Sequence, residues 1–410
     1  MIKSKLKSRD LYLNKLISFM DTEPVKVVTG IRRCGKSSLL KLMVEHLKNI
    51  GIGDEQIVEM NFESNAYKEM TSNDVYSYVK NKCGGKRMYL FFDEIQNVKF
   101  WEKSIVSYYT DLDCDIYITG SNSNLLSGEL STHLTGRYME IRMYPFSFNE
   151  FCDYKLESLD LDESDENLLR YYKRQWLDEF IWQGSFPFSL SISSEDRFDY
   201  LQDIFNSILY NDLIERYSIR DINILNKLIS FLLDNVGNVF SSNSISNFLK
   251  SENVSVSAVT IQNYLKYIEN TCLFNRVPRE DIKGKELLKT NEKYYVVDTG
   301  FIQAIRGKNR YDNRGRVIEN IVFLELIKRG YSVTIGKLNG FEIDFLCRKN
   351  NEIFYVQVAE RIHEGNIDRE FGSLLKLKDN YPKYVVSADE DDKSMHGIRH
   401  ISLLDFLIDF

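Results

Sequence analysis

The sequence predicts an α/β protein that begins with a doubly wound parallel sheet. Apolar runs rich in β-branched and aromatic residues, at 25–29, 57–62, 87–95 and 115–122, alternate with segments of helical periodicity. This alternation is typical of parallel sheets covered by helices. The first run leads through a glycine-rich turn into an amphipathic helix, which is the local order of a phosphate-binding loop.

Composition and charge argue against several classes of protein. The 410 residues suffice for two to four domains, and the formal net charge of -7 argues against coating nucleic acid by bulk charge. No run of about 18 apolar residues occurs, so we expect no contact with a membrane interior. The basic start lacks the apolar segment of a signal peptide, and six scattered cysteines without a C-x-x-C pair indicate reduced thiols. We therefore expect a cytoplasmic protein.

The glycine-rich turn carries the pattern G-x-x-x-x-G-K-[ST], formed by Gly30, Gly35, Lys36 and Ser37. Glycines let successive backbone N–H groups point into one cavity, and the following helix adds the positive end of its dipole. Lys36 is expected to reach the β- and γ-phosphates of a nucleotide, and Ser37 to offer its hydroxyl to Mg²⁺. The expected nucleotide contacts lie along the whole loop: Gly30, Ile31, Arg32, Arg33, Cys34, Gly35, Lys36, Ser37 and Ser38.

Two carboxylates, Asp93 and Glu94, end the apolar strand expected at 87–95. Ligands of open α/β sheets bind at the carboxyl ends of the strands, where this pair would lie. Asp93 suits the Mg²⁺ shell, and Glu94 is placed to orient or deprotonate an attacking water. An acidic strand end is often only solubilising, but its place after a phosphate loop favours a catalytic role.

Polar residues also follow the strand expected at 115–122. Ser121 and Asn122 are candidates to hydrogen-bond the γ-phosphate or the water, or else to cap a helix. Arg137 is either an arginine finger, acting on the nucleotide of its own chain or of a neighbouring subunit, or an ordinary surface residue.

Four motifs occur in order along this part of the chain: TGIRRCGKSSLL, LFFDEIQ, ITGSNSNLLS and LTGRYMEIRMYPFSFNEF. They resemble the AAA-superfamily P-loop ATPases of bacteria and archaea that carry a C-terminal domain of unknown function. The resemblance extends over nearly the whole chain and implies an AAA-type sheet, binding of ATP with Mg²⁺, and ATP hydrolysis. Under this resemblance, Arg32 and Arg33 either contact the nucleotide or a partner, or they brace the loop against an Asp or Glu side chain. By position it assigns the loop pair Lys36 and Ser37, the metal and water carboxylates Asp93 and Glu94, the sensor Ser121, and Arg137 in an open role.

After residue 145 helical periodicity dominates. Helices are expected at 168–184, 196–217, 222–236, 241–250 and 257–271, followed by strands at 273–279 and 293–298. The last three helices, with Ser242 and Ser257 as expected N-caps, and the strand pair follow the plan of a winged helix. A DNA-binding interpretation would use Ser257, Thr260, Gln262, Asn263 and Lys266 on the third helix and Lys283 and Lys285 in the wing. Acidic neighbours, and the lack of clustered Lys and Arg, favour a protein–protein spacer instead.

A smaller α/β domain is expected from a helix at 316–330 and strands at 331–335, 341–347 and 353–359. Glu319, Asp344 and Gln357 resemble the core of restriction-endonuclease-like folds, whose active members bind Mg²⁺ through acidic residues and use a Lys two positions further on. Ala359 stands where that Lys would be. We therefore expect a retained fold without cleavage, used for packing, assembly or nucleic-acid contact.

These inferences combine into an expected function. Four segments are expected: an AAA-type ATPase domain at 1–150, a helical lid region at 151–221, a winged helix at 222–300 and a nuclease-like domain at 301–410. Mg²⁺-dependent ATP hydrolysis would reposition the C-terminal domains, with double-stranded DNA or a protein client as partner, and with a homo-oligomer if Arg137 acts across an interface. Two alternatives stay open: a DNA-associated regulatory module that binds nucleotide with negligible turnover, and an ATP-gated nuclease.

Overall fold

The computed structural model describes residues 6–121, 136–157, 159, 165–288, 291–307 and 314–410. The contacts divide the chain into two compact units, Met1–Tyr144 with Asn270–Cys272, and Pro145–Glu269 with Leu273–Phe410. Within the described residues, no helix is both long and apolar enough to cross a membrane.

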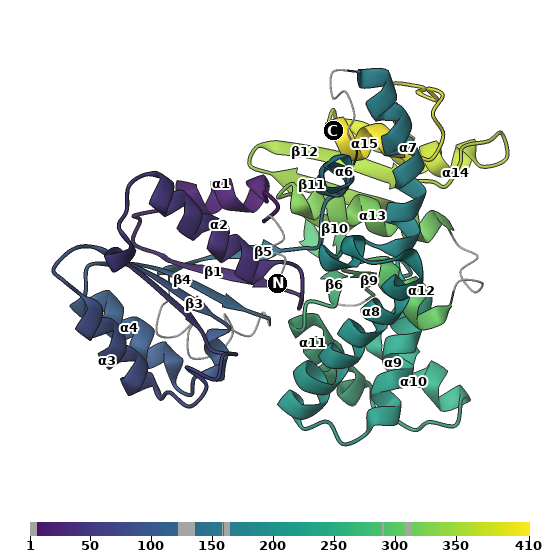
Figure 1. Ribbon diagram of the computed structural model, residues 1–410. Coiled ribbons are helices and arrows are strands. Elements are labelled where there is room, and N and C mark those ends of the chain that lie inside the picture. Colours follow the sequence, from purple (N-terminus) through teal and green to yellow (C-terminus); the bar gives the residue numbers. More distant parts are fainter. Residues whose placement is uncertain (1–5, 122–135, 158, 160–164, 289–290, 308–313) are drawn as a thin grey trace. The chain divides into compact units, whose positions relative to one another are not determined.

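The first unit contains a five-stranded sheet in the order β2-β3-β4-β1-β5 (Figure 1). Every pairing in it is parallel, which confirms the predicted sheet type. β1 and β3 are buried along their whole length, as expected for central strands covered on both faces. The strands are β1 (Val25–Gly30), β2 (Ile57–Asn61), β3 (Met88–Asp93), β4 (Cys114–Gly120) and β5 (Tyr138–Met143).

Helices cover both faces of this sheet. α1 (Asp10–Ser18) and α2 (Lys36–Asn49) lie on one face, and α3 (Ser72–Lys82) and α4 (Trp101–Asp111) on the other (Figure 1). Short 3-10 turns, η1 (Asp54–Gln56) and η2 (Ile95–Asn97), precede β2 and follow β3. The apolar side chains between the sheet and the pair α3 and α4 form a continuous core that includes Phe62, Val79, Phe92, Ile105 and Tyr108. This core fixes the strand ends at which the predicted site lies.

The second unit starts with helices. They are α6 (Phe148–Leu156), α7 (Glu166–Gln183), η4 (Phe188–Ser191), α8 (Ser194–Ser207), α9 (Ile222–Asp234), α10 (Ser242–Ser251), α11 (Ala258–Asn270) and α12 (Gly300–Arg306). Where one long helix was predicted at 196–217, α8 instead passes into a π-helix, η5 (Ile208–Glu215). The predicted cap of α10 is wrong by one residue, because the reciprocal capping pair is Ser241 and Ser244, not Ser242.

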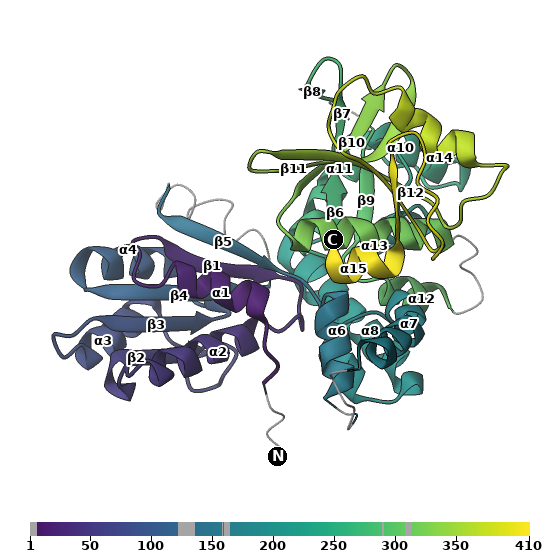
Figure 2. The same ribbon diagram turned by 90° about the horizontal axis from the view of Figure 1, so that it is seen from above.

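A seven-stranded sheet follows in the order β14-β13-β12-β11-β10-β7-β8. β10, β11 and β12 pair antiparallel, whereas β12, β13 and β14 pair parallel. Of its helices, α13 and α15 contact each other, and α14 lies over β11 to β13 (Figure 2). The remaining elements are α13 (Arg314–Lys328), β10 (Ser332–Leu338), β11 (Phe341–Lys349), β12 (Glu352–Val358), α14 (Ile367–Leu375), β13 (Lys383–Ser387), β14 (Arg399–Ser402) and α15 (Leu403–Asp409).

The predicted wing is only partly present. β6 (Phe274–Val277) and β9 (Lys293–Val296) pair antiparallel as expected. The segment between them does not form a wing tip, because β7 (Arg279–Asp281) pairs with β10 and β8 (Glu286–Leu287) pairs with β7. Lys283 and Lys285 therefore lie in a hairpin at the edge of the seven-stranded sheet.

Candidate nucleotide-binding site

The loop between β1 and α2 has the backbone that its glycines predict. Gly30 and Gly35 have φ of 145° and 105°, a region in which an L side chain is strained. A Cβ on Gly30 would also lie 2.2 Å from the carbonyl oxygen of Met143 on the neighbouring strand. Gly35 immediately precedes α2, so the turn places Lys36 and Ser37 in the first turn of that helix.

Lys36 points back into the loop. Its Nζ donates to the carbonyl oxygens of Gly30, at 3.0 Å, and of Ile31, at 3.1 Å. The same Nζ lies 3.8 Å from Oε1 of Glu94, and the lysine side chain is only 4% exposed. The fold thus brings the lysine of the loop to the acidic pair that ends β3.

Uncharged side chains orient the acidic pair. Thr119 on β4 donates its hydroxyl to Oδ1 of Asp93, at 2.5 Å, and accepts the backbone N–H of Glu94, at 3.0 Å. Asn61, at the end of β2, donates to Oδ2 of Asp93 at 3.0 Å, and Gln96 donates to Oε2 of Glu94. Because none of these donors carries a charge, they hold the carboxylates in place without neutralising them.

Glu94 also has an uncommon backbone conformation. Its φ is 53°, in the left-handed region, directly after the last residue of β3. Such a conformation costs about 1 kcal/mol or more in a residue other than glycine, and it is often found at functional sites. The turn ends the strand, and the two carboxylates have different partners: Asp93 accepts from Thr119 and Asn61, and Glu94 from Gln96.

Ser121 follows β4, which lies between β3 and β1 in the sheet. Its side chain is 1% exposed, and its Oγ has no hydrogen-bond partner among the described residues. A buried hydroxyl without a partner is rare in folded proteins. Asn122, the other candidate on this strand end, lies outside the described residues.

The other loop residues have different environments. Ser37 is exposed in the first turn of α2, and Ser38 is half-buried. Arg32 lies 3.9 Å from Glu63, which agrees with the bracing alternative. Arg33 is exposed, with a left-handed φ of 66°. The side chains of Ile31 and Cys34 are buried, and their backbone carbonyls accept hydrogen bonds from Lys36 and Arg9.

Arg137 lies at the opposite end of the sheet from the loop. Its carbonyl accepts the N–H of Val25, the first residue of β1, and its guanidinium lies 5.3 Å from the ring centre of Tyr109. The loop begins at Gly30, the last residue of β1, roughly 16 Å away at about 3.3 Å per residue. The alternative in which Arg137 acts on the nucleotide of its own chain is therefore wrong, because the side chain lies at the other end of the sheet. Action on a neighbouring subunit stays a prediction.

Three residues near the site were missed by sequence reasoning. Besides Thr119 and Asn61, Arg9 donates to the carbonyl oxygens of Cys34, at 2.9 Å, and of Tyr144, at 2.8 Å, and is 2% exposed. Arg9 thereby joins the loop to the residue that follows β5. The polar ends of two apolar strands pointed weakly to Asn61 and Thr119, but no pattern pointed to Arg9.

The donor atoms suit Mg²⁺. Ser37 and Asp93 offer hydroxyl and carboxylate oxygens, the ligands that this cation prefers. No group of three or more side chains able to hold a metal ion is found in the described part of the chain. Mg²⁺ in nucleotide sites is typically held by one or two protein groups together with the phosphates, so two oxygen donors are sufficient.

The second unit brings the three nuclease-like candidates together, with one addition. Glu319 on α13 and Asp344 on β11 both face Nζ of Lys293 on β9, at 2.9 Å and 3.5 Å. Gln357 on β12 accepts the backbone N–H of Asp344, at 3.4 Å. Lys293 was not identified from the sequence, because it precedes the motif and lies on another sheet.

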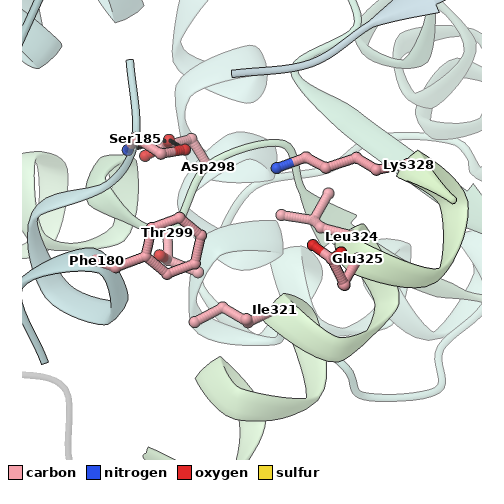
Figure 3. Close-up of a pocket in the computed structure, with 8 residues that line it drawn as sticks. All are labelled: Phe180, Ser185, Asp298, Thr299, Ile321, Leu324, Glu325 and Lys328. Carbon is pink, nitrogen blue, oxygen red and sulfur yellow. Dashed lines mark hydrogen bonds between the residues drawn. The ribbon is translucent and has the colours of Figure 1, made fainter. Parts of the chain in front are cut away.

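A small cavity elsewhere in the second unit has a structural explanation. Figure 3 shows Lys328 extending toward Asp298 and Ser185 across this cavity. Asp298 accepts the backbone N–H groups of Ser185, at 2.7 Å, and Gly300, at 2.9 Å, and Lys328 donates to the carbonyl of Phe146, at 2.9 Å. The protein itself satisfies these polar groups, so they brace the turn after α7.

Together, the parallel sheet, the phosphate-type loop after β1 and the acidic pair after β3 define a P-loop ATPase domain of the AAA type, a nucleotide-binding fold. In agreement with this class, residues 22–152 match the family described as AAA domain. Residues 174–312 match a domain of unknown function, DUF8612, and this match spans the boundaries expected at 221/222 and 300/301.

Full-length relatives show the family. An uncharacterized protein of Haemophilus influenzae is 41% identical over 407 residues, covering 98% of each chain. An uncharacterized protein of Methanocaldococcus jannaschii is 31% identical over 401 residues, covering 95% of this chain and 86% of its own. The chain belongs to the family of these two proteins.

A solved structure shares the fold. The Walker-type ATPase PABY2304 of Pyrococcus abyssi aligns with 75% of this chain and 99% of its own, with a TM-score of 0.51 and 14% identity. At this identity the likeness concerns the fold alone.

Proposed function

We propose that the protein hydrolyses ATP with Mg²⁺ at the loop between β1 and α2. One observation carries the proposal: the ammonium of Lys36 and the carboxylate of Glu94 lie 3.8 Å apart, at the C-terminal ends of β1 and β3. A cation for phosphate oxygens and a base for water are the two groups that phosphoryl transfer to water requires in one place.

Each side chain has a distinct part. Lys36 and the N-terminus of α2 bind phosphate oxygens, while Ser37 and Asp93 would hold Mg²⁺, which supplies positive charge to the phosphates. Glu94 orients the attacking water and receives its proton. The hydroxyl of Ser121, which has no hydrogen-bond partner in the described part of the chain, is available to the γ-phosphate or to that water. These groups position and stabilise charge, which accounts for most of the catalysis of phosphoryl transfer.

Two substitutions at these strand ends, Lys36→Ala and Glu94→Gln, test the proposal. Lys36→Ala should lose both ATP binding and phosphate release, whereas Glu94→Gln should bind ATP and release phosphate about 10²–10⁴ times more slowly. Lys48→Ala is a matched control, because Lys48 is exposed on the same helix as Lys36 and pairs with Asp54 outside the site. Equal phosphate release by wild type, Lys36→Ala and Glu94→Gln would contradict the assignment.

Arg137 is proposed to act on the nucleotide of a second copy, because its own loop lies at the far end of β1. Arg137→Ala and Lys36→Ala would then each be inactive alone, but a mixture would contain sites built from one intact loop and one intact arginine. Mixing the two variants should restore part of the phosphate release, and the wild-type rate per subunit should rise with protein concentration. Wild-type turnover by Arg137→Ala at every concentration would contradict a shared site.

The cycle is further proposed to reposition the second unit for a protein client or for double-stranded DNA. The observation in favour of DNA is that Gln262, Asn263 and Lys266 all lie on the exposed side of α11. Binding of duplex DNA should then weaken steeply between 50 and 200 mM salt, and Lys266→Ala should reduce the salt slope by about one, unlike Lys250→Ala on α10. Absence of salt-dependent binding would favour the protein client.

A further inference from the structure

The acidic centre of the second unit contains a lysine instead of a place for a metal ion. Nζ of Lys293 lies 2.9 Å from Oε1 of Glu319, 2.9 Å from Oε1 of Glu342 and 3.5 Å from Oδ1 of Asp344. The lysine reaches these groups from β9, while the carboxylates come from α13 and β11. One ammonium therefore has three carboxylates around it, supplied by two other elements.

This ammonium is shielded from water. The side chain of Lys293 is 4% exposed, and those of Glu319 and Asp344 are 12% and 10% exposed. Burial by itself would lower the pKa of Lys293, but the carboxylates of Glu319, Asp344 and Glu342 raise it above its ordinary value. Lys293 is therefore a permanent positive charge in this centre.

A nuclease-like core would be expected to hold Mg²⁺ among these carboxylates, and the residues present do not fit that ion. The oxygens that would bind a cation already face the ammonium, and a divalent ion would have to share them with a positive charge at contact distance. Gln357, the third predicted ligand, uses its amide oxygen on the backbone N–H of Asp344. Ala359, at the position of the usual lysine, is buried in the apolar core.

Other bonds at the same place tie β9 to α13. Tyr295 donates its hydroxyl to Oε1 of Glu319, at 2.6 Å. The side-chain amide of Asn320 exchanges two hydrogen bonds with the backbone of Val296, at 2.8 Å and 2.9 Å. Besides the contact of Lys293 with Glu319, three hydrogen bonds therefore join the two-stranded sheet to α13, which packs against the seven-stranded sheet.

We propose that Lys293 is the built-in cation of this centre, so that the carboxylates fasten β9 to α13 and β11 instead of binding a divalent metal. The centre is a joint of the second unit and not a hydrolytic site. This inference does not depend on ATP hydrolysis by the first unit.

Metal binding tests the proposal directly. Mn²⁺ titrations of the full chain without nucleotide, followed by electron paramagnetic resonance, would compare wild type, Asp344→Asn, Lys293→Met and the double variant Lys293→Met/Asp344→Asn. Wild type and Asp344→Asn should bind equal amounts of Mn²⁺. Lys293→Met should gain one site, and the double variant should lose it again. The first unit contributes equally to all four and cancels in the differences.

Two results would overturn the proposal. One is a Mn²⁺ site in wild type that Asp344→Asn removes, and this comparison remains valid even if Lys293→Met fails to fold. The other is a folded Lys293→Met that gains no site. Melting temperature provides a second readout: Lys293→Met should lower it by several degrees, whereas Lys283→Met, at an exposed lysine of the β7–β8 hairpin, should leave it unchanged. Equal melting of the two variants would contradict the fastening role.

Discussion

Two acidic centres of this chain, one in each unit, place a lysine beside carboxylates in contrasting ways. In the first unit Lys36 lies 3.8 Å from Glu94 and bonds mainly to backbone carbonyls, while Thr119, Asn61 and Gln96 hold the acids. In the second unit Lys293 is in direct contact with Glu319 and Glu342. Neutral donors and a lysine 3.8 Å away leave more of the carboxylate charge available for a ligand than an ammonium in direct contact does. The identity of the donors around a carboxylate thus separates a binding site from a structural joint.

The largest effects are expected from one substitution in each centre, which should have opposite consequences for turnover and stability. Glu94→Gln should slow phosphate release about 10²–10⁴-fold and change the free energy of unfolding by less than about 1 kcal/mol. Lys293→Met should do the reverse, lowering the free energy of unfolding by about 3–5 kcal/mol because buried Asp344 and half-buried Glu319 and Glu342 lose the ammonium that they share, with turnover retained. Phosphate release and urea unfolding of both variants provide the measurements. Loss of turnover in folded Lys293→Met would break the contrast between the centres.

A smaller effect is expected from Thr119→Val, which keeps the shape of the side chain and removes its hydroxyl. Asp93 would lose a donor and the N–H of Glu94 would lose its acceptor. Groups that orient metal ligands and catalytic acids typically contribute 10–100-fold, so phosphate release should fall by about that factor and require more Mg²⁺. Thr110→Val on α4 is the control, since that hydroxyl donates to the carbonyl of Val106 within its own helix. Unchanged Mg²⁺ dependence in Thr119→Val would contradict the positioning role.

The acidic centre around Lys293 should also make the stability of the folded chain depend on pH. Burial and the carboxylate of Glu319 raise the pKa of Asp344 to about 7, although Lys293 lowers it; Glu342 raises it further. The folded chain then binds a proton more tightly than the unfolded chain between about pH 4 and 7, so this contribution to stability falls as pH rises through that window.

Urea unfolding at several pH values checks this sign. Asp344→Asn should flatten the decline between pH 5 and 7, and Asp199→Asn, at an exposed position of α8, should not. A decline that persists unchanged in Asp344→Asn would assign the pH dependence to another group.

The smallest predicted effect concerns the link between the loop and β5. Arg9→Lys keeps the charge but cannot reproduce two bonds from one planar guanidinium to the carbonyls of Cys34 and Tyr144. The free energy of unfolding should fall by about 1 kcal/mol, and ATP should bind more weakly because the loop is less fixed. Unfolding and nucleotide titrations of Arg9→Lys and of Lys15→Arg, on α1, would show whether the bond geometry matters. Equal behaviour of the two variants would deny Arg9 this role.

Local patterns pointed to the residues that the fold brings together in the first centre, and their roles in ATP hydrolysis stay predictions. Gly30, Gly35, Lys36, Asp93 and Glu94 are recognisable because the loop and the strand end each lie within a few residues of sequence. The parallel order of the strands also followed from the alternation of strand and helix, and the structure confirms it.

Long-range pairing decided what could not be predicted. Thr119 reaches Asp93 only through the register of β3 against β4, and Arg137 is removed from its own loop by the pairing of Val25 with Tyr138. The strand pair of the wing was predicted correctly, but its tip was not, because β7 pairs with β10, far along the chain. No sequence motif contains Lys293, and its contacts depend on how β9 packs against α13 in the folded chain.

The hydroxyl of Thr119 has a consequence for how this ATPase domain can vary. A single oxygen donates to the carboxylate assigned to the metal and accepts from the backbone of the residue assigned to water. Under the roles proposed for Asp93 and Glu94, the cation preference and the rate of hydrolysis both depend on this one oxygen atom. A substitution at this position is then expected to change both properties together, so relatives that differ in either property are expected to differ at the Thr119 position.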